Sequence, residues 1–478
     1  MKPAIAFLAT TLFLPLLAGV SSHAADAQPK PFRAGAATSN VTPPLGTAIN
    51  GNFAEGHATH VHDELNARCL VLDDGTTKLA IAVCDNTLIP REVHDAAKQR
   101  ASQATGIPIE NILISATHSH SCGSVVSVFG AEADEGYKKV LAVRIADGIR
   151  RAYNNLAPAR IGWAVGSLPG QVFNRRWHMK PGAKLPNPFG GFDQVRMNPG
   201  AGNPELAEPA GPTDPGVSVV AVQSPDGRPI ALLANYSLHY VGGVGAGHIS
   251  ADYFGMFCDR VQELLKADRE DPPFVAMLSN GTSGDVNNIN FRAPAPKFPP
   301  YGKMRAVACD VAAEAVRVTQ GIQYRDWVPL GARRKELTLG IRLPAAAEVE
   351  RAKGILAKAD GRALKGAEEV FARETVLMSR WPAEDHLVIQ AFRIGDLAVA
   401  QLPCEVFTEI GLDIKQRSPF KPTFTVELAN GYSGYLPTPA QHEMGGYETW
   451  RARSSYLETG ASPKITAALM ELLDGLRK

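Results

Sequence analysis

Residues 112–124 read ILISATHSHSCGS, an aliphatic run that leads directly into two histidines two positions apart. A short, isoleucine-rich run bounded by polar residues is typical of a buried β-strand. Side chains two apart on an extended segment point to the same side, so His118 and His120 would stand together just past the strand end. The pair either consists of polar residues that simply end the strand or is the first half of a metal site.

Similar aliphatic runs alternate with amphipathic helical segments through the rest of the chain. Helical periodicity is clearest at 91–105 and 252–267. The strand-like runs are LAIAVCD (79–85), VSVVAVQ (217–223), PIALLANYSLH (229–239), FVAMLSN (274–280) and HLVIQAFRIGDLAVAQLP (386–403). This alternation predicts an α/β (mixed α+β) fold, with mixed sheets flanked by helices and a site at the strand ends.

The composition of the chain limits the classes of binding partner that we expect. Its 478 residues are 45% hydrophobic and 20% charged, and the formal net charge is +1. These values are ordinary for a globular chain, and the balanced charge argues against a nucleic-acid partner. No sequence feature indicates an obligate protein partner.

The N-terminus has the pattern of a targeting segment. Lys2 is followed by an apolar stretch from about Ala4 to Val20, and then by the small residues Ser22 and Ala24. The pattern predicts a cleavable secretory signal peptide at 1–24, with a buried N-terminal helix as the alternative. We therefore expect a secreted or periplasmic protein in which residues 25–478 form one domain.

Two segments of this domain differ from the rest in composition. Residues 173–215 are rich in proline, glycine and asparagine and are too long for a simple connection, so they predict a structured functional loop or a lid. Residues 344–380 are charged and rich in alanine, which predicts one or two exposed helices. We interpret the second segment as a helical excursion on the surface.

The six cysteines are widely spread and include no CxxC pair. Cys69 and Cys84 lie in neighbouring strand-like runs and could face each other. For the remaining four, buried free thiols are an equally good interpretation.

Polar side chains also follow the other strand-like runs. They are His239, Ser279, Asn280, Ser283, Asp285, Glu405, Tyr435, His442 and Tyr447. Each has a structural explanation when taken alone: a histidine after a strand often donates to a backbone carbonyl, and a glutamate at a helix start is stabilised by the helix dipole. His62 and Asp63 are interpreted as local caps. No compact metal motif such as HExxH is present, so residue types alone leave both interpretations open.

Taken together, several blocks of the chain resemble the neutral (alkaline, non-lysosomal) ceramidase family, which are secreted or membrane-facing zinc amidohydrolases. The blocks follow the order of the family: FRAGAATSNVTPPLG (32–46), HDELNARCLVL (62–72), SATHSHS (115–121), FNRR (173–176), GPTDPGVSV (211–219), SGDVNN (283–288), LPCEVFTEIG (402–411) and YETWRA (447–452). The resemblance implies that residues 25–478 form a ceramidase-like catalytic domain.

The resemblance also implies a ligand set and a reaction. The implied ligands of one zinc ion are His118, His239, Glu405 and Tyr435. The resemblance places His120 beside the metal, in contact with substrate or water, and gives Arg175 and Tyr447 roles at the active site, Tyr447 steadying an oxyanion. The implied reaction is hydrolysis of the N-acyl amide of ceramide or a related N-acylated lipid by a zinc-activated water, with peripheral membrane contact. A second, structural Ca²⁺ or Mg²⁺, with Asp63 or Asp214 among its ligands, stays open.

The sequence departs from the family in two ways. The family's GDVSPN-like loop reads GDVNNIN here, so Asn287 stands at a serine position; it could donate a hydrogen bond but cannot act as a nucleophile, which favours the zinc-water mechanism. Ser283 is a weaker nucleophile candidate. The chain ends roughly thirty residues after Tyr447, which leaves no room for the family's C-terminal immunoglobulin-like domain. Two alternatives therefore remain: a zinc hydrolase of another amide or an ester, and a catalytically silent lipid- or carbohydrate-binding relative.

Overall fold

The computed structural model describes residues 1, 3, 4, 6, 8, 31–267 and 271–477. By its contacts the chain divides into Met1–Lys30 and Pro31–Lys478, and the second unit is described below. The predicted signal peptide falls almost entirely outside the described residues and stays a prediction. No helix among the described residues combines the length and the apolar character needed to cross a bilayer.

The first sheet has the strand order β5-β4-β3-β1-β6. Its strands are β1 (Arg33–Asn40), β3 (Asn66–Asp73), β4 (Lys78–Cys84), β5 (Ile112–Ala116) and β6 (Ala157–Pro158). β4 and β5 are parallel, whereas the other pairs are antiparallel. Helices α1 (Arg91–Thr105) and α2 (Glu135–Asn154) pack on it. The α1 helix ends at Gly106, whose φ of 73° is a conformation that glycine adopts readily.

The second sheet has the order β15-β13-β12-β7 and the third has the order β17-β18-β19-β21. The second contains β7 (Arg160–Ser167), β12 (Gly216–Gln223), β13 (Pro229–Tyr236) and β15 (Val275–Asn280). The third contains β17 (Leu330–Gly340), β18 (Glu384–Ile394), β19 (Leu397–Gln401) and β21 (Thr423–Val426). Each of these sheets again has one parallel pair, β13–β15 and β19–β21.

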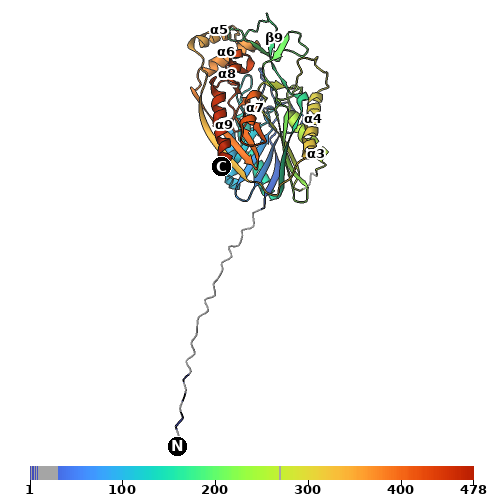
Figure 1. Cartoon of the computed structure of the whole chain (residues 1–478). Helices are drawn as coiled ribbons and strands as arrows, with labels where there is room; N and C mark the ends of the chain where they lie inside the picture. The colour runs from blue at the N-terminus through green and yellow to red at the C-terminus, as the bar shows by residue number, and fades with distance from the viewer. Residues whose placement is uncertain (2, 5, 7, 9–30, 268–270, 478) are drawn as a thin grey trace. The chain divides into compact units, whose positions relative to one another are not determined.

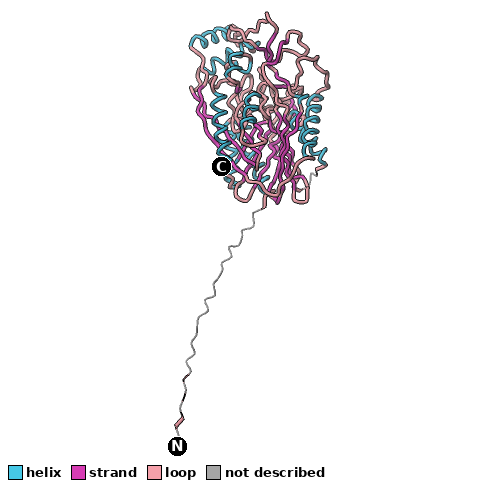
Figure 2. The backbone as a smooth tube through the Cα atoms, viewed as in Figure 1, coloured by secondary structure: helices cyan, strands magenta, loops and turns pink. Residues whose placement is uncertain are grey.

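The three sheets share one apolar core. Leu72 of the first sheet, Leu233 of the second and Phe392 of the third belong to the same buried cluster. The outer face of the second sheet is covered by α3 (Asp252–Leu265) and α4 (Gly302–Thr319), and that of the third by α7 (Thr408–Arg417) and α9 (Ala461–Arg477). Figures 1 and 2 show the resulting order, in which α3 and α4 lie on one flank, α9 lies on the other, and strands fill the space between them. The mixed α/β fold with sheets flanked by helices is thus confirmed.

The remaining elements are short. The strands are β2 (His60–Val61), β8 (Phe173–Asn174), β9 (Arg176–Met179), β10 (Val195–Met197), β11 (Leu206–Pro209), β14 (His248–Ile249), β16 (Val286–Asn287), β20 (Glu405–Val406) and β22 (Tyr435–Leu436). The helices are α5 (Ala346–Ala357), α6 (Gly366–Met378), α8 (Pro439–Met444) and the 3-10 turns η1 (Ile109–Asn111), η2 (Pro169–Gln171) and η3 (Tyr447–Thr449). The stretch 173–215 therefore contains strands, and three of them form the small sheet β10-β9-β11.

The cysteines are all free thiols, and all six lie in the described part of the chain. In the β3–β4 register Cys69 stands opposite Ala82, and Cys84 stands opposite Ala67. The expectation that Cys69 and Cys84 face each other is therefore wrong, because the register places them two positions apart along the ladder.

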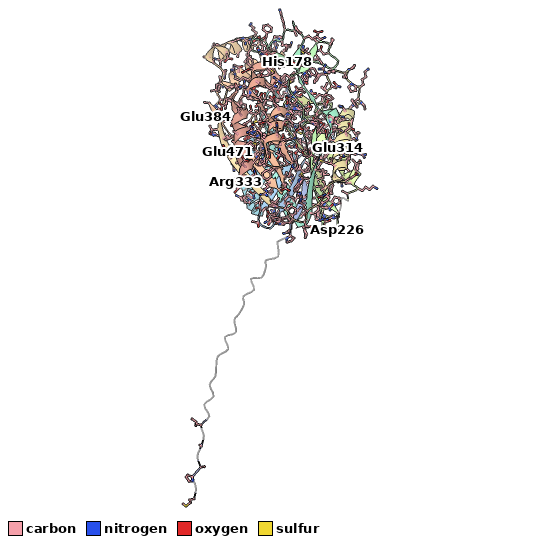
Figure 3. All side chains as sticks on the ribbon, viewed as in Figure 1. His178, Asp226, Glu314, Arg333, Glu384 and Glu471 are labelled. Carbon is pink, nitrogen blue, oxygen red and sulfur yellow. The ribbon has the colours of Figure 1, made fainter. Side chains whose placement is uncertain are left out.

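Figure 3 identifies the two ends of the unit: His178 on β9 lies at one end, and Asp226, in the turn between β12 and β13, lies at the other. Strand β13 runs away from the Asp226 turn, and backbone hydrogen bonds join the carboxyl ends of the parallel strands: Gly281 N donates to Tyr236 O, Glu427 N to Asn280 O and Asn430 N to Ile114 O. Carboxyl ends of parallel strands are where loops with functional side chains commonly gather.

Candidate functional site

Three histidines converge at this end of the sheets. His118 and His120 follow β5, and His239 follows β13. The Nε2 atom of His118 lies 3.0 Å from Nε2 of His239 and 3.2 Å from Nε2 of His120. His118 and His239 are buried, and His120 is half-buried. Their ligand atoms are close enough together that the three histidines could hold one metal ion.

The opposite nitrogen of each ring faces a backbone carbonyl. The distances are 2.9 Å from His118 Nδ1 to Thr87 O, 3.1 Å from His120 Nδ1 to Gly51 O and 3.1 Å from His239 Nδ1 to Ser283 O. A carbonyl oxygen can only accept, so each Nδ1 carries a proton, and Nε2 of a neutral ring keeps a lone pair that is free to accept. Histidines that ligate metals are typically oriented in this way.

The titration behaviour of the three rings differs. Burial lowers the pKa of His120 well below its usual value, and burial followed by the charge of Arg175 does the same for His239. Burial also opposes the charged form of His118, yet the nearby Glu405 carboxylate leaves its pKa raised. The lowered pKa values favour the neutral form of His120 and His239, and a cation held between the rings would relieve the repulsion of their lone pairs.

Glu405 on β20 and Tyr435 on β22 lie beside the histidines. These two strands pair in parallel, with Glu405 directly opposite Tyr435. One carboxylate oxygen, Oε2, lies 3.3 Å from His118 Nε2, is buried and has no hydrogen-bond donor among the described residues. The other, Oε1, accepts from the hydroxyl of Tyr432 at 3.2 Å. An unsatisfied buried carboxylate oxygen aimed at imidazole lone pairs is the arrangement that a metal cation completes.

The hydroxyl of Tyr435 accepts a hydrogen bond from Arg175 Nη2 at 3.1 Å. Burial and then the charge of Glu405 raise the pKa of Tyr435 well above its usual value, so the phenol keeps its proton in the absence of a cation. A neighbouring metal ion is the kind of charge that can remove this proton.

Arg175 connects this part of the site to a buried ion pair. Its Nη1 lies 3.4 Å from His239 Nε2, and its Nε donates to Glu448 Oε1 at 2.8 Å. Arg176 donates to the other oxygen of Glu448 at 2.7 Å. Glu448 therefore fixes Arg175, and the sequence analysis missed it. An acidic residue beside Tyr447 carries no local pattern that separates it from a surface glutamate.

The site encloses a cavity of about 30 Å³ that is lined by the histidines His118 and His120, by Glu405 and by Tyr435 and Tyr447. This space is of the order of one or two water molecules. Burial raises the pKa of Tyr447, which therefore presents a protonated hydroxyl group at neutral pH.

Asn287 and Ser283 lie elsewhere in the network. Asn287, on β16, donates to Asn198 Oδ1 at 2.6 Å and accepts from the backbone N–H of Ile289. The hydroxyl of Ser283 donates to Glu427 Oε1 at 2.6 Å, and only the carbonyl of Ser283 contacts His239. The described contacts therefore give neither side chain a place beside the three histidines.

The remaining candidates have structural partners. Asp63 accepts from Ser250 Oγ at 2.7 Å and from the backbone N–H of Ala251 at 2.6 Å, while Asp214 pairs with Lys415. Among the remaining polar candidates, Ser279 and Asn280 end β15, Asp285 is buried beside Thr408, and His442 lies on α8. In the described part of the chain, the three histidines are the one group of metal-binding side chains with convergent ligand atoms.

Comparisons with known proteins show that the fold of this chain resembles that of solved structures. No protein-family model matches the sequence, and neither does any curated protein. Solved structures do match, among them two ceramidases. The neutral ceramidase from Pseudomonas aeruginosa has a TM-score of 0.72 at 18% identity, over 94% of this chain and 74% of that one. A ceramidase complexed with C2 has a TM-score of 0.71 at 19% identity, over 94% and 75%. The chain has a ceramidase-like fold whose buried histidine cluster could hold a metal ion.

Proposed function

We propose that this protein belongs to the neutral ceramidase family and is a metal-dependent amidohydrolase that cleaves the N-acyl amide of ceramide or a related N-acylated lipid. The observation that supports it most strongly is the approach of His118 Nε2 and His239 Nε2 to 3.0 Å beside a buried Glu405 oxygen without a donor, with His120 Nε2 adjacent at 3.2 Å from His118 Nε2. Ligands for such a site and a ceramidase-like fold occur together in one chain.

The donor set fits zinc best among the common metal ions. Imidazole nitrogen, carboxylate oxygen and phenol oxygen are the ligand types of a zinc site, whereas calcium and magnesium prefer all-oxygen sites. His118, His239, Glu405 and Tyr435 would hold the ion. When bound, zinc lowers the pKa of a coordinated water and polarises an amide carbonyl.

The side chains of the site would provide the remaining chemistry. Arg175 and Tyr447 can donate hydrogen bonds to the oxygen on which negative charge develops during amide hydrolysis. His120 is neutral and its Nε2 can accept a proton from water and deliver it to the leaving amine. Glu448 keeps the Arg175 guanidinium oriented through the hydrogen bond at 2.8 Å.

Export and membrane contact belong to the same proposal. The N-terminal pattern supports secretion or delivery to the periplasm, and a ceramide-type substrate would bring the protein to a membrane surface. Amino-terminal sequencing of the protein recovered from the medium or periplasm checks the first point, because it reads the cleavage position directly.

Metal content and turnover measured together test the proposal. Purified wild type, His118→Ala and Glu405→Ala would be assayed by elemental analysis and for hydrolysis of N-acylsphingosine, with His178→Ala on β9 as the control histidine. We expect about one zinc ion per chain in wild type and in the control, and loss of both metal and turnover in the two site variants. A wild-type protein that binds no metal when zinc is supplied would overturn the proposal.

A further inference from the structure

A second cleft, here called the side cleft, adjoins the histidine cavity. Its volume is about 360 Å³, and Tyr447 lines both spaces. Phe53 also lines the side cleft, and its ring centroid lies 4.9 Å from that of Phe129, which borders the histidine cavity. A substrate with its amide bond at the histidines can therefore extend one end into the side cleft.

Two positive charges of the side cleft are free to meet a ligand. Lys184 and Arg196 line it and are exposed, and within residues 31–267 and 271–477 neither side chain has an ion pair or a hydrogen bond. The acidic side chain of the described lining, Asp193, already accepts from Trp450 Nε1 at 2.8 Å and from Asn187 Nδ2 at 3.1 Å. The Asp193 carboxylate is therefore bound by neutral donors, and among the described residues it does not pair with Lys184 or Arg196.

The other walls of the side cleft are apolar. Leu185, Val195, Met197 and the ring of Trp450 line it together with the cations. Its volume is at the small end of the range for ligand pockets, so it suits a compact group better than a long hydrocarbon chain. A neutral amide lipid would gain nothing from the two exposed cations, which stay hydrated, whereas an anionic group gains charge-assisted hydrogen bonds from them.

We infer that the substrate carries a carboxylate close to its scissile amide: it is an N-acylated amino acid, whose amino acid half occupies the side cleft. The inference rests on the proposed amide hydrolysis and specifies its substrate class. In that reaction water adds across the amide, the C–N bond breaks, and one proton of the water passes to the nitrogen. The products are a fatty acid and a free amino acid.

Turnover of a matched pair of substrates tests the inference. N-lauroylglycine and N-lauroylethanolamine share the acyl chain and differ in a carboxylate against a hydroxymethyl group. For wild type we expect kcat/KM to be about tenfold or more higher for the acid. In a Lys184→Ala, Arg196→Ala double variant this preference disappears through a higher KM for the acid, while kcat and the ethanolamide values stay unchanged. Lys180→Ala, an exposed lysine that does not line the side cleft, is the control.

A binding measurement separates this inference from the proposed function. The dodecylsulfonyl derivatives of glycine and ethanolamine resist hydrolysis, so calorimetry with the zinc-loaded protein reports affinity alone. Tighter binding of the glycine derivative in wild type, lost in the double variant, supports the inference even if no amide is turned over. Equal affinity for the two derivatives, or equal kcat/KM for the two amides, overturns it and leaves the proposed amide hydrolysis intact.

Discussion

Two groups of neighbouring histidines lie within residues 31–267 and 271–477, and they differ in what their rings face. In the buried group, His118, His120 and His239 each donate from Nδ1 to a backbone carbonyl and turn Nε2 toward one another. In the surface group, formed by His60, His62 and His248, side chains provide the partners: His62 Nδ1 lies 2.6 Å from Asp63 Oδ1, and His248 Nδ1 lies 2.5 Å from Tyr301 Oη.

The comparison teaches that proximity of histidines does not by itself make a metal site. His60 and His248 are directly opposite each other in the β2–β14 register, with ring centroids 4.6 Å apart. They lack the carbonyl contacts that orient the rings of the buried group, and among the described residues the one carboxylate oxygen without a donor beside histidines is Glu405 Oε2, which faces His118. Orientation by the backbone, more than the number of imidazoles, distinguishes the buried group.

Replacing one histidine in each group gives the largest expected contrast. His239→Ala removes a lone pair from the buried group, and we expect loss of bound zinc and a fall in turnover of roughly a thousandfold, because the metal contributes several kcal/mol to the barrier. His248→Ala should leave both quantities unchanged. Elemental analysis and initial rates measure the two effects, and an equal loss in both variants would remove the distinction between the groups.

His94 shows the effect of burial apart from convergence, because it is buried but does not belong to the group of three histidines. His94 lies on α1 in the core, and burial followed by the charge of Lys98 lowers its pKa to about 3 from a usual value of 6.5. Between these values the unfolded chain binds a proton that the folded chain does not, so the free energy of unfolding falls as the pH falls through this window.

The variant His94→Leu tests this linkage. Wild type should lose about 2 kcal/mol more than the variant between pH 7 and pH 5, while the zinc content of the two proteins stays the same. Urea unfolding at the two pH values measures the difference. The same pH dependence in both proteins would show that His94 does not titrate as its burial requires.

The smallest expected contrast concerns two similar ring stacks. Tyr240 stacks on His120 with centroids 3.7 Å apart and planes 13° apart, and Tyr301 stacks on His62 at 3.7 Å and 12°. Tyr240→Ala should lower kcat about tenfold by freeing the His120 ring, and Tyr240→Phe should restore it. Tyr301→Ala should leave kcat within about twofold, since that stack is outside the buried group. A kcat that is unaffected by Tyr240→Ala would mean that the hydrogen bond to Gly51 alone positions His120.

Local pattern was sufficient for the larger elements of the fold. The helical periodicity at 91–105 coincides with α1, and the aliphatic run at 112–116 coincides with β5, because both signals depend on residues close in sequence. Strands β9, β10 and β11 have only three or four residues each, too few for periodicity to find them within 173–215.

The residue types of the site could be predicted from the sequence, but the orientation of their side chains could not. Strand-end positions drew attention to His118, His239 and Glu405, and the family resemblance grouped them. The carbonyls of Thr87 and Ser283 that fix the rings are backbone atoms with no sequence signature. Glu448 and the free cations of the side cleft depend on contacts between segments far apart in the chain, which no local pattern encodes.

The pairing of β20 with β22 has a consequence for how the proposed site would acquire a metal ion. Glu405 and Tyr435 become neighbours only when these two strands meet, so a ribosome must have passed Tyr435 before the complete set of donors exists. Until then Glu405 has no partner strand, and the imidazoles alone would not discriminate strongly among divalent ions. The ions available in the compartment where folding finishes would therefore govern which metal the proposed site takes up.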